Sequence, residues 1–186
     1  MRRLAFAVLA SAFAISLPLF AEQEAGTRFA VAIERNDAEA VKALLDEGVP
    51  VDTFIDYGEH KITPLMKAAW EGDATIVEML LAAGAKIEDG AHGMPPLQFA
   101  ASAGKVDMIR FLVKRGANVN YGVKAGGQTA LLYAIYGGHV DAVKALIELK
   151  ADVNAKTKDG DTPLSAAKKG DQEELIAILK AAGAKK

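Results

Sequence analysis

Apolar residues recur along this chain at helical spacing, in short stretches that come in pairs. In one pair, the second stretch carries Ile76, Val77, Leu80 and Leu81 at i, i+3 and i+4 spacing, which predicts an amphipathic helix. The same pattern returns at Ile109, Leu112 and Val113 and at Val143, Leu146 and Ile147. In the four later pairs the first stretch begins at a leucine and continues through alanines; these leucines are Leu65, Leu97, Leu131 and Leu164. The pattern therefore predicts pairs of short helices, each with one apolar face.

These pairs recur at a nearly constant interval. Units start at Thr27, Thr63, Pro95, Thr129 and Thr162, which are 36, 32, 34 and 33 residues apart. In every unit the residue 21 positions after the start closes the second helix. These closing residues are Gly48, Gly84, Gly116, Lys150 and Gly183. Glycine suits a helix end because it enters the left-handed conformation without a steric penalty. No single unit can bury its apolar face, so the units are predicted to stack.

The unit resembles the ankyrin repeat, whose signature is T-P-L-H-x-A at a period of 33 residues. The copy that starts at Thr63 reads T-P-L-M-K-A-A-W-E-G-D, then I-V-E-M-L-L, then A-G-A. The signature histidine is absent from every copy, and Asn36 and Lys150 replace glycines that are usual in the family. The resemblance implies an all-α repeat solenoid of about five helix-turn-helix units with hairpin-like connecting loops. We expect one ankyrin domain at 22–186, with units over 27–52, 63–88, 95–120, 129–154 and 162–186.

The first 21 residues do not follow this pattern. Met1-Arg2-Arg3 is basic, the run from Leu4 to Leu19 is apolar apart from two serines, and polar residues follow Ala21. This order predicts a secretory signal peptide at 1–21, cleaved after Ala21. The alternative is an uncleaved anchor, although the run is at the lower limit of the roughly 17 to 25 residues that a span needs. Either interpretation places the units outside the cytoplasmic membrane. With the family resemblance, it implies a periplasmic protein, with secretion as the second choice.

Composition narrows the chemistry. Hydrophobic residues make up 51% of the chain and charged residues 25%, which excludes disorder. The chain has no cysteine, so lipoprotein anchoring, disulfides, zinc-thiolate sites and thiol catalysis are excluded.

Charge is unevenly divided along the chain. The formal total is -2, but residues 22–104 hold 15 acids and 6 bases, a net -9, and residues 105–186 hold 9 acids and 14 bases, a net +5. This division is either uneven statistics on a solvated surface or a means of orienting a partner with the opposite pattern. A mildly acidic chain without a basic stripe is a poor candidate for nucleic-acid binding.

No nucleophile, base and orienting group can be assembled into a catalytic set, so we predict that the chain is not an enzyme and has no cofactor. His139 follows two glycines at a position where ankyrin repeats commonly carry a structural histidine. His60 and His92 lie on successive connecting loops. A small-molecule or metal-dependent activity at these two histidines is the alternative function. The glycines at 122–127 resemble a phosphate loop only superficially, because Gln128 stands where the lysine should be.

Recognition of a partner is therefore expected on the loop tips and on the exposed flank of the first helices. The connector between Asp52 and Thr63 is three residues longer than in the regular unit, and Trp70, the only tryptophan, lies at the variable end of a first helix. The predicted partner-binding residues are Phe54, Ile55, Tyr57, Trp70, Glu71, Ser102, Tyr121 and Tyr136. Aromatic residues beside charges are typical of interface hot spots.

Two alternatives concern single residues of this surface. Phe54 or Ile55 could tuck under its own loop, and Trp70 could lie flat on a neighbouring unit. Phe99 and Tyr133 are one helical step inward, and we expect them in the core.

Together these features predict a monomeric, non-catalytic module that binds another protein through a preformed surface. We expect it to bind no nucleic acid and, after removal of the leader, no membrane. The family resemblance implies an envelope partner. It also implies that binding inhibits or protects a periplasmic enzyme, such as a cell-wall hydrolase or a peroxide-handling enzyme.

Overall fold

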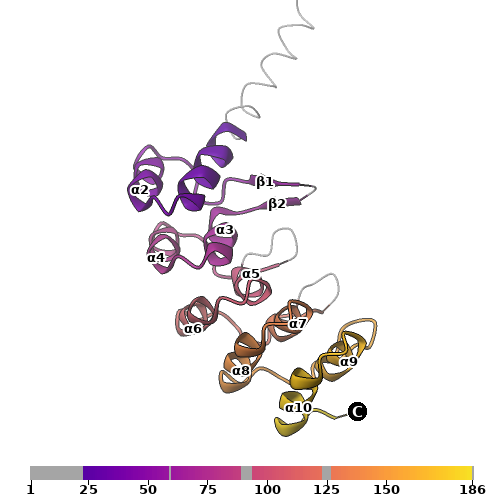
Figure 1. Cartoon of the computed structure of the whole chain (residues 1–186). Coiled ribbons are helices and arrows are strands. Elements are labelled where there is room, and N and C mark those ends of the chain that lie inside the picture. Colours follow the sequence, from indigo (N-terminus) through magenta and orange to yellow (C-terminus); the bar gives the residue numbers. More distant parts are fainter. Residues whose placement is uncertain (1–22, 59, 89–93, 123–126, 186) are drawn as a thin grey trace, which may run out of the picture.

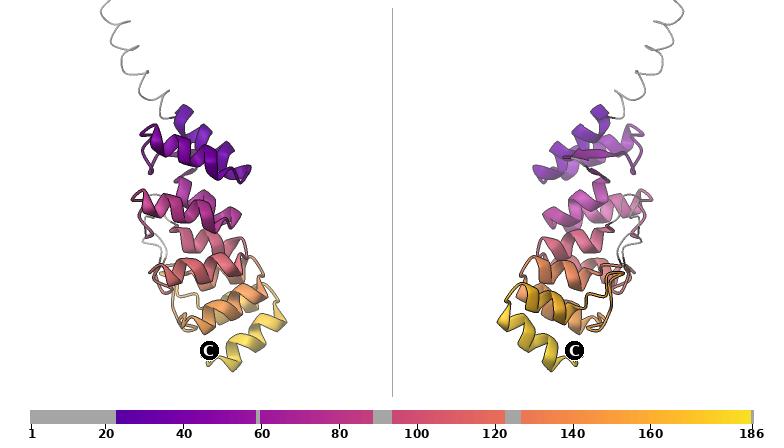
Figure 2. Two further views of the ribbon diagram at one scale, coloured as in Figure 1. Left: turned by 90° about the vertical axis from the view of Figure 1, so that its left-hand side faces the viewer. Right: turned by 90° about the vertical axis from the view of Figure 1, so that its right-hand side faces the viewer.

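The computed structural model describes residues 23–58, 60–88, 94–122 and 127–185. The predicted leader at 1–21 lies outside these residues. Within them, paired helices stack into a curved array, with the first helices and a β-hairpin on its inner side (Figure 1). The side views show the pairs following one another in layers along the array (Figure 2). The predicted all-α repeat stack is confirmed.

The helices form two rows. The inner row holds the helical residues 23–34, α3 (Pro64–Glu71), α5 (Pro96–Ser102), α7 (Ala130–Tyr136) and α9 (Pro163–Lys169). The outer row holds α2 (Ala38–Asp46), α4 (Ala74–Ala82), α6 (Val106–Lys114), α8 (Val140–Glu148) and α10 (Glu173–Ala181). None of the helices described is both long and apolar enough to cross a membrane.

Threonine begins two of the inner helices as the sequence predicts. The Thr63 hydroxyl accepts a hydrogen bond from the Met66 amide, and the Thr162 hydroxyl accepts one from the Ser165 amide at 3.1 Å. Each satisfies an amide that the first helical turn leaves free. Thr129 makes no such bond before α7, so the threonine does not have this role in every unit.

Three residues stand at helix ends where other units have glycine, and all three, Asn36, Lys150 and Asp171, adopt the left-handed glycine conformation. Asn36 has a φ of 53° and Lys150 a φ of 72°. Asparagine tolerates this left-handed region, whereas lysine is strained there. The turn geometry that the repeat demands therefore overrides local preference at Lys150.

A column of alanines runs through the centre of the array. Ala68, Ala100, Ala134 and Ala167 lie five residues after their unit starts, and each is 0% exposed. Their small side chains let α3, α5, α7 and α9 pack directly on one another. Large apolar residues of the outer row complete the core; Leu80, Leu112, Leu146 and Leu179 are all 0% exposed.

Asparagines join successive units just after the C-terminal ends of the outer helices. The Asn120 side chain donates to the Lys150 carbonyl at 3.3 Å and accepts from the Asp152 amide at 2.7 Å. The Asn154 side chain makes the same bridge: it donates to the Gly183 carbonyl at 3.4 Å and accepts from the Lys185 amide at 2.8 Å. Each bridge satisfies a carbonyl that a helix end leaves unpaired.

The enlarged connector forms an antiparallel β-hairpin of β1 (Ile55–Tyr57) and β2 (His60–Ile62). Ile55 pairs with Ile62 at its base, and these residues are 3% and 4% exposed. Ile55 was predicted as part of the exposed binding surface; instead it belongs to the core, because the hairpin turns this end against the stack.

Residues 23–26 are already helical, although the first unit was predicted to start at Thr27. This first helix lies very close to the hairpin at Gly26. A Cβ atom at Gly26 would lie 2.0 Å from the Phe54 carbonyl oxygen, so only glycine fits without a shift of the backbone. Sequence periodicity gives no sign of this contact.

Replacing Gly26 with alanine is therefore expected to destabilise the N-terminal unit, by about 1–3 kcal/mol as for other overpacked sites. Denaturant unfolding of the variant measures the change. The matched control is Gly48→Ala, because a Cβ at Gly48 has no neighbour within 4 Å and only its φ of 81° opposes the change. A Gly26→Ala variant as stable as the wild type would show that the helix and the hairpin are not in contact.

Candidate binding face

Four aromatic residues line the inner row of helices. Trp70 and Phe99 lie on consecutive inner helices with their ring centroids 6.3 Å apart in an edge-to-face arrangement. Tyr133 and Tyr136 on α7 make a second edge-to-face pair, also at 6.3 Å. We call these four residues the aromatic stripe. Since α3, α5 and α7 pack side by side, the stripe extends over three units.

Exposure varies along the aromatic stripe. Tyr136 is 53% exposed, while Trp70, Phe99 and Tyr133 are half-buried. The expectation that Phe99 and Tyr133 belong to the core is wrong in this respect: they pack against it but keep part of their surface open. Burial raises the pKa of both Tyr133 and Tyr136 above the ordinary tyrosine value, which favours the protonated hydroxyl that can donate hydrogen bonds.

A buried lysine links the hairpin to the inner helices. The Lys67 side chain is 7% exposed, and its Nζ donates to Glu71 Oε1 at 2.8 Å and lies 2.9 Å from Glu34 Oε1. The same Nζ is 5.7 Å from the centre of the Tyr57 ring. Burial lowers the pKa of Lys67, but its bonds to Glu71 and Glu34 outweigh this and raise the pKa above the ordinary lysine value.

Lys67 therefore holds Tyr57 and Glu71, two of the predicted residues, on the same part of the surface. Tyr57 is 47% exposed. Lys67 itself was not predicted. The i, i+4 spacing of Lys67 and Glu71 is visible in the sequence and could have drawn attention to it. The sequence gives no such signal for the pairing of Lys67 with Glu34, because Glu34 belongs to the preceding unit.

The other predicted residues have different surroundings. Phe54 is half-buried, and Lys61 Nζ lies 5.9 Å from its ring centre. The Ser102 carbonyl accepts a hydrogen bond from His139 Nε2 at 2.9 Å, and the Tyr121 carbonyl accepts one from the buried Gln98 at 2.8 Å. Ser102 is the last residue of α5, in the unit between those of Trp70 and Tyr136.

The histidines divide into different roles. His139 makes the contact expected of a structural residue, since its ring fills the space beside Gly104 and Gly137. His60 is exposed on β2, and His92 lies outside the described residues. Among the residues that the structure describes, no three histidine, aspartate or glutamate side chains are grouped to hold a metal ion.

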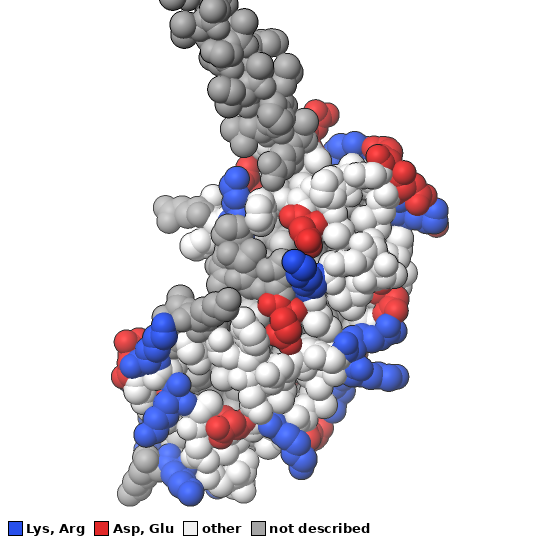
Figure 3. All heavy atoms as spheres, turned by 180° about the vertical axis from the view of Figure 1, so that it is seen from behind, with Lys and Arg blue, Asp and Glu red and all other residues white. Residues whose placement is uncertain are grey.

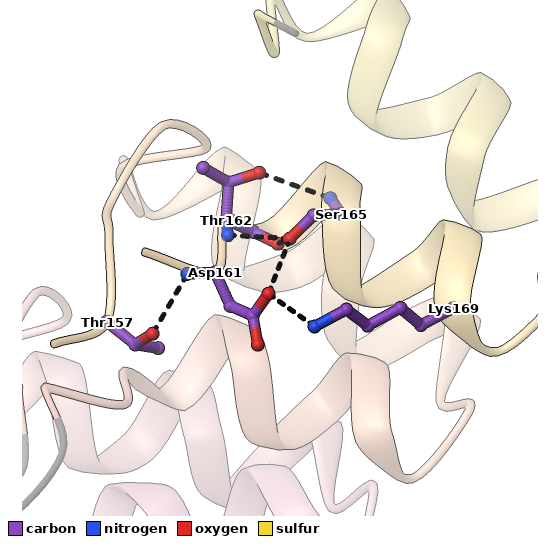
Figure 4. A network of polar contacts seen from close by, with 5 residues as sticks. All are labelled: Thr157, Asp161, Thr162, Ser165 and Lys169. Atoms are coloured by element: carbon purple, nitrogen blue, oxygen red, sulfur yellow. Dashed lines mark hydrogen bonds and ion pairs between the residues drawn. The ribbon is translucent and has the colours of Figure 1, made fainter. Parts of the chain in front are cut away.

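A polar network lies at the start of α9 (Figure 4), and its charged residues Asp161 and Lys169 act on Tyr136 of the aromatic stripe. Asp161 Oδ1 accepts from Lys169 Nζ at 2.6 Å and from the Ser165 hydroxyl at 3.2 Å. The Asp161 amide donates to the Thr157 hydroxyl at 3.0 Å. The negative charge of Asp161 also contributes to the raised pKa of Tyr136. Lysine and arginine side chains predominate toward this C-terminal end, in the lower part of Figure 3, as the net +5 of residues 105–186 requires.

Hydrogen bonding from Lys169 lowers the pKa of Asp161. The stability that this pair contributes is present above the ordinary aspartate pKa and is lost as pH falls through the lowered one. Lys169→Met is expected to move the Asp161 midpoint upward, toward its ordinary value, in an NMR titration of the carboxyl carbons. Lys168→Met, the neighbouring exposed lysine, is the control and should leave it unchanged. An Asp161 midpoint that is the same in Lys169→Met and wild type would contradict the network.

Comparison with known proteins agrees with this architecture. No curated protein matches the sequence. A family model described as Ankyrin repeats (3 copies) matches residues 17–91 and again residues 86–157. Ankyrin repeats are generally modules for protein–protein interaction. Since the two matches cover more than half of the chain, this protein belongs to the ankyrin repeat family.

Proposed function

We propose that this chain is a non-catalytic protein of the bacterial envelope that binds another protein through the aromatic stripe, Tyr57 and Glu71. One observation supports this most strongly: large aromatic side chains stay partly open along one row of helices where the packing itself needs only alanine and leucine. Tyr57 and Tyr136 are among the few large hydrophobic residues that are exposed in the described part of the chain. Partly buried aromatics of this kind are frequent in interface hot spots.

The mechanism is recognition by a preformed surface. The inner helices are fixed by the alanine column, and Tyr57 is held by β1 and by its contact with Lys67. Little conformational entropy is then lost when a partner binds. A partner that presents its own catalytic cleft to this face would be inhibited, and one that presents an exposed unstable surface would be protected.

The proposed location depends on the leader. Its basic, apolar and polar order supports export to the periplasm with cleavage after Ala21, and secretion is the second choice. Intact mass of the chain from an envelope fraction should correspond to a start at Glu22. A full-length chain confined to the cytoplasm would contradict export, and it would leave the binding face to be tested separately.

Site-specific photo-crosslinking tests the binding face. A benzophenone amino acid is placed at Tyr136, at Tyr57, or at Lys144 on the outer helix α8 as the matched control. Irradiation of producing cells should give one discrete protein adduct from positions 136 and 57 and none from position 144. Adducts from position 144 alone would place the interface on the outer row and contradict the proposal.

The alternative of a metal-dependent or small-molecule activity at His60 and His92 is not proposed. It needs the two side chains together, and only the exposed His60 lies in the described part of the chain.

A further inference from the structure

The residue just before three of the outer helices, α6, α8 and α10, fills a gap between successive units. At α6 this residue is Lys105, whose side-chain carbons lie against Gly72 of the preceding unit. At α8 it is His139, which lies beside Gly104 and donates to the Ser102 carbonyl at 2.9 Å. At α10 it is Gln172, whose Nε2 donates to the Ile135 carbonyl at 2.8 Å. In three gaps, therefore, a long side chain reaches back to the preceding inner helix.

The gap between the first two units lacks such a side chain. The equivalent residue before α4 is Asp73, which is short and caps its own helix: its Oδ1 accepts from the Thr75 amide at 2.8 Å and the Ile76 amide at 3.0 Å. An open cavity of about 520 Å³ lies in this gap. That volume is within the range of roughly 300–1,000 Å³ typical of ligand pockets. Its lining includes Ile33, Glu34, Asn36, Glu71, Gly72 and Asp73.

In the later gaps the hydrogen-bond acceptors are the backbone carbonyls of Ser102 and Ile135. The cavity is lined by the residues at the same positions of the first unit. Ser102 and Ile135 lie seven and six residues after their unit starts, and Glu34 and Ile33 hold these positions in the first unit. The cavity adds the carboxylates of Glu34, Glu71 and Asp73. Lys67 Nζ pairs with the Oε1 atoms of Glu34 and Glu71, whereas in the described part of the chain Asp73 Oδ1 accepts only from amides of α4, so the three carboxylates of the lining share one ammonium group. A side chain with several N–H donors and a positive charge fits this environment.

We infer that this cavity receives an arginine side chain of the partner protein, which takes the place that Lys105, His139 and Gln172 occupy in the other gaps. The inference rests on the proposed protein-binding function and names the chemistry of the partner at one point. Glu71 lies both in the cavity and next to Trp70, so an arginine here continues the interface of the aromatic stripe. The net charge of -9 over residues 22–104 favours a basic partner segment at this end.

The test uses a blocked arginine, N-acetyl-arginine N-methylamide, as the probe. It is added to the ¹⁵N-labelled chain that starts at Glu22, and amide shifts are followed by NMR. Saturable shifts are expected at Glu34, Glu71 and Asp73, and the uncharged citrulline analogue should not reproduce them. Shifts that do not saturate, or that the citrulline analogue reproduces, would overturn the inference.

Two variants separate the cavity from general electrostatics. Asp73→Lys fills the gap with the side chain that lies at Lys105 in the next unit, and it should weaken probe binding by about tenfold or more, the size expected when a close charge contact is lost. Asp37→Lys is the matched control, because Asp37 caps α2 in the same way and does not line this cavity. It makes the same change of charge and should bind the probe like the wild type. Equal weakening by both variants would overturn the inference.

The partner-level readout distinguishes this inference from the proposed function. Once the partner is identified by crosslinking, Asp73→Lys should weaken its binding and Asp37→Lys should not. Unchanged partner affinity in Asp73→Lys, with the crosslink from Tyr136 intact, would overturn the arginine site and leave the binding face standing. If the chain without the Asp73 or Asp37 substitution gives no crosslink from position 136 or 57, the proposed function is overturned instead.

Discussion

Replacing Leu112 with alanine is expected to lower the free energy of unfolding by about 2–5 kcal/mol, as for other buried leucines. Leu112 is 0% exposed in α6, and its unit has neighbours on both sides. The substitution removes apolar contacts and leaves a cavity that the flanking helices cannot fill. Urea denaturation followed by circular dichroism measures the change.

Leu179→Ala is the matched comparison, because it deletes the same atoms at another residue that is 0% exposed. Leu179 lies in α10, where α8 and α9 are the packing neighbours and no described helix follows. The end of the array can relax or fray, so we expect a smaller loss of stability than at Leu112. Equal and small losses at both residues would contradict a core that is shared between stacked units.

Trp70→Ala is expected to reduce both partner binding and stability. Truncation of a central interface aromatic commonly costs about 2 kcal/mol or more of binding free energy, roughly a thirtyfold loss of affinity. Trp70 is also half-buried and in edge-to-face contact with Phe99, and such a ring pair contributes about 0.5–1.5 kcal/mol beyond the area it buries. Titration calorimetry with the crosslinked partner and thermal unfolding measure the two effects separately.

Trp70→Phe is the control for Trp70, because it retains a ring against Phe99. It should recover most of the stability and only part of the affinity. A Trp70→Ala variant that loses stability but binds the partner like the wild type would show that Trp70 is a packing residue alone.

The helical pairs could be predicted because their signals are local and repeat five times in phase. Apolar spacing, threonine at the start and glycine at the end of a unit each act within a few residues, and the structure has helices where these signals predict them. The alanine column is equally visible, since its residues recur at one position of the unit.

The surface was harder to predict because it depends on how units meet. A short apolar run such as Phe54-Ile55 is compatible with an exposed loop or with the base of a hairpin, and only the pairing with Ile62 decides. Helical periodicity likewise shows that Phe99 and Tyr133 face inward but not where the next unit stops covering them. The Lys67 pair with Glu34, and the gap beside Asp73, arise only when neighbouring units are placed together.

The central claim is that the inner row of helices, with its aromatic stripe, is the surface that binds a partner protein. The most direct test is the dissociation constant of the crosslinked partner for Tyr136→Ala, compared with Phe111→Ala in the outer helix α6. Tyr136 is 53% exposed, so its removal should lower the melting temperature only by what the loss of its edge contact with Tyr133 costs, and should raise the dissociation constant about thirtyfold. Phe111→Ala should leave the dissociation constant unchanged. An unchanged constant for Tyr136→Ala, together with weaker binding by Phe111→Ala, would place the interface on the outer row and contradict this account.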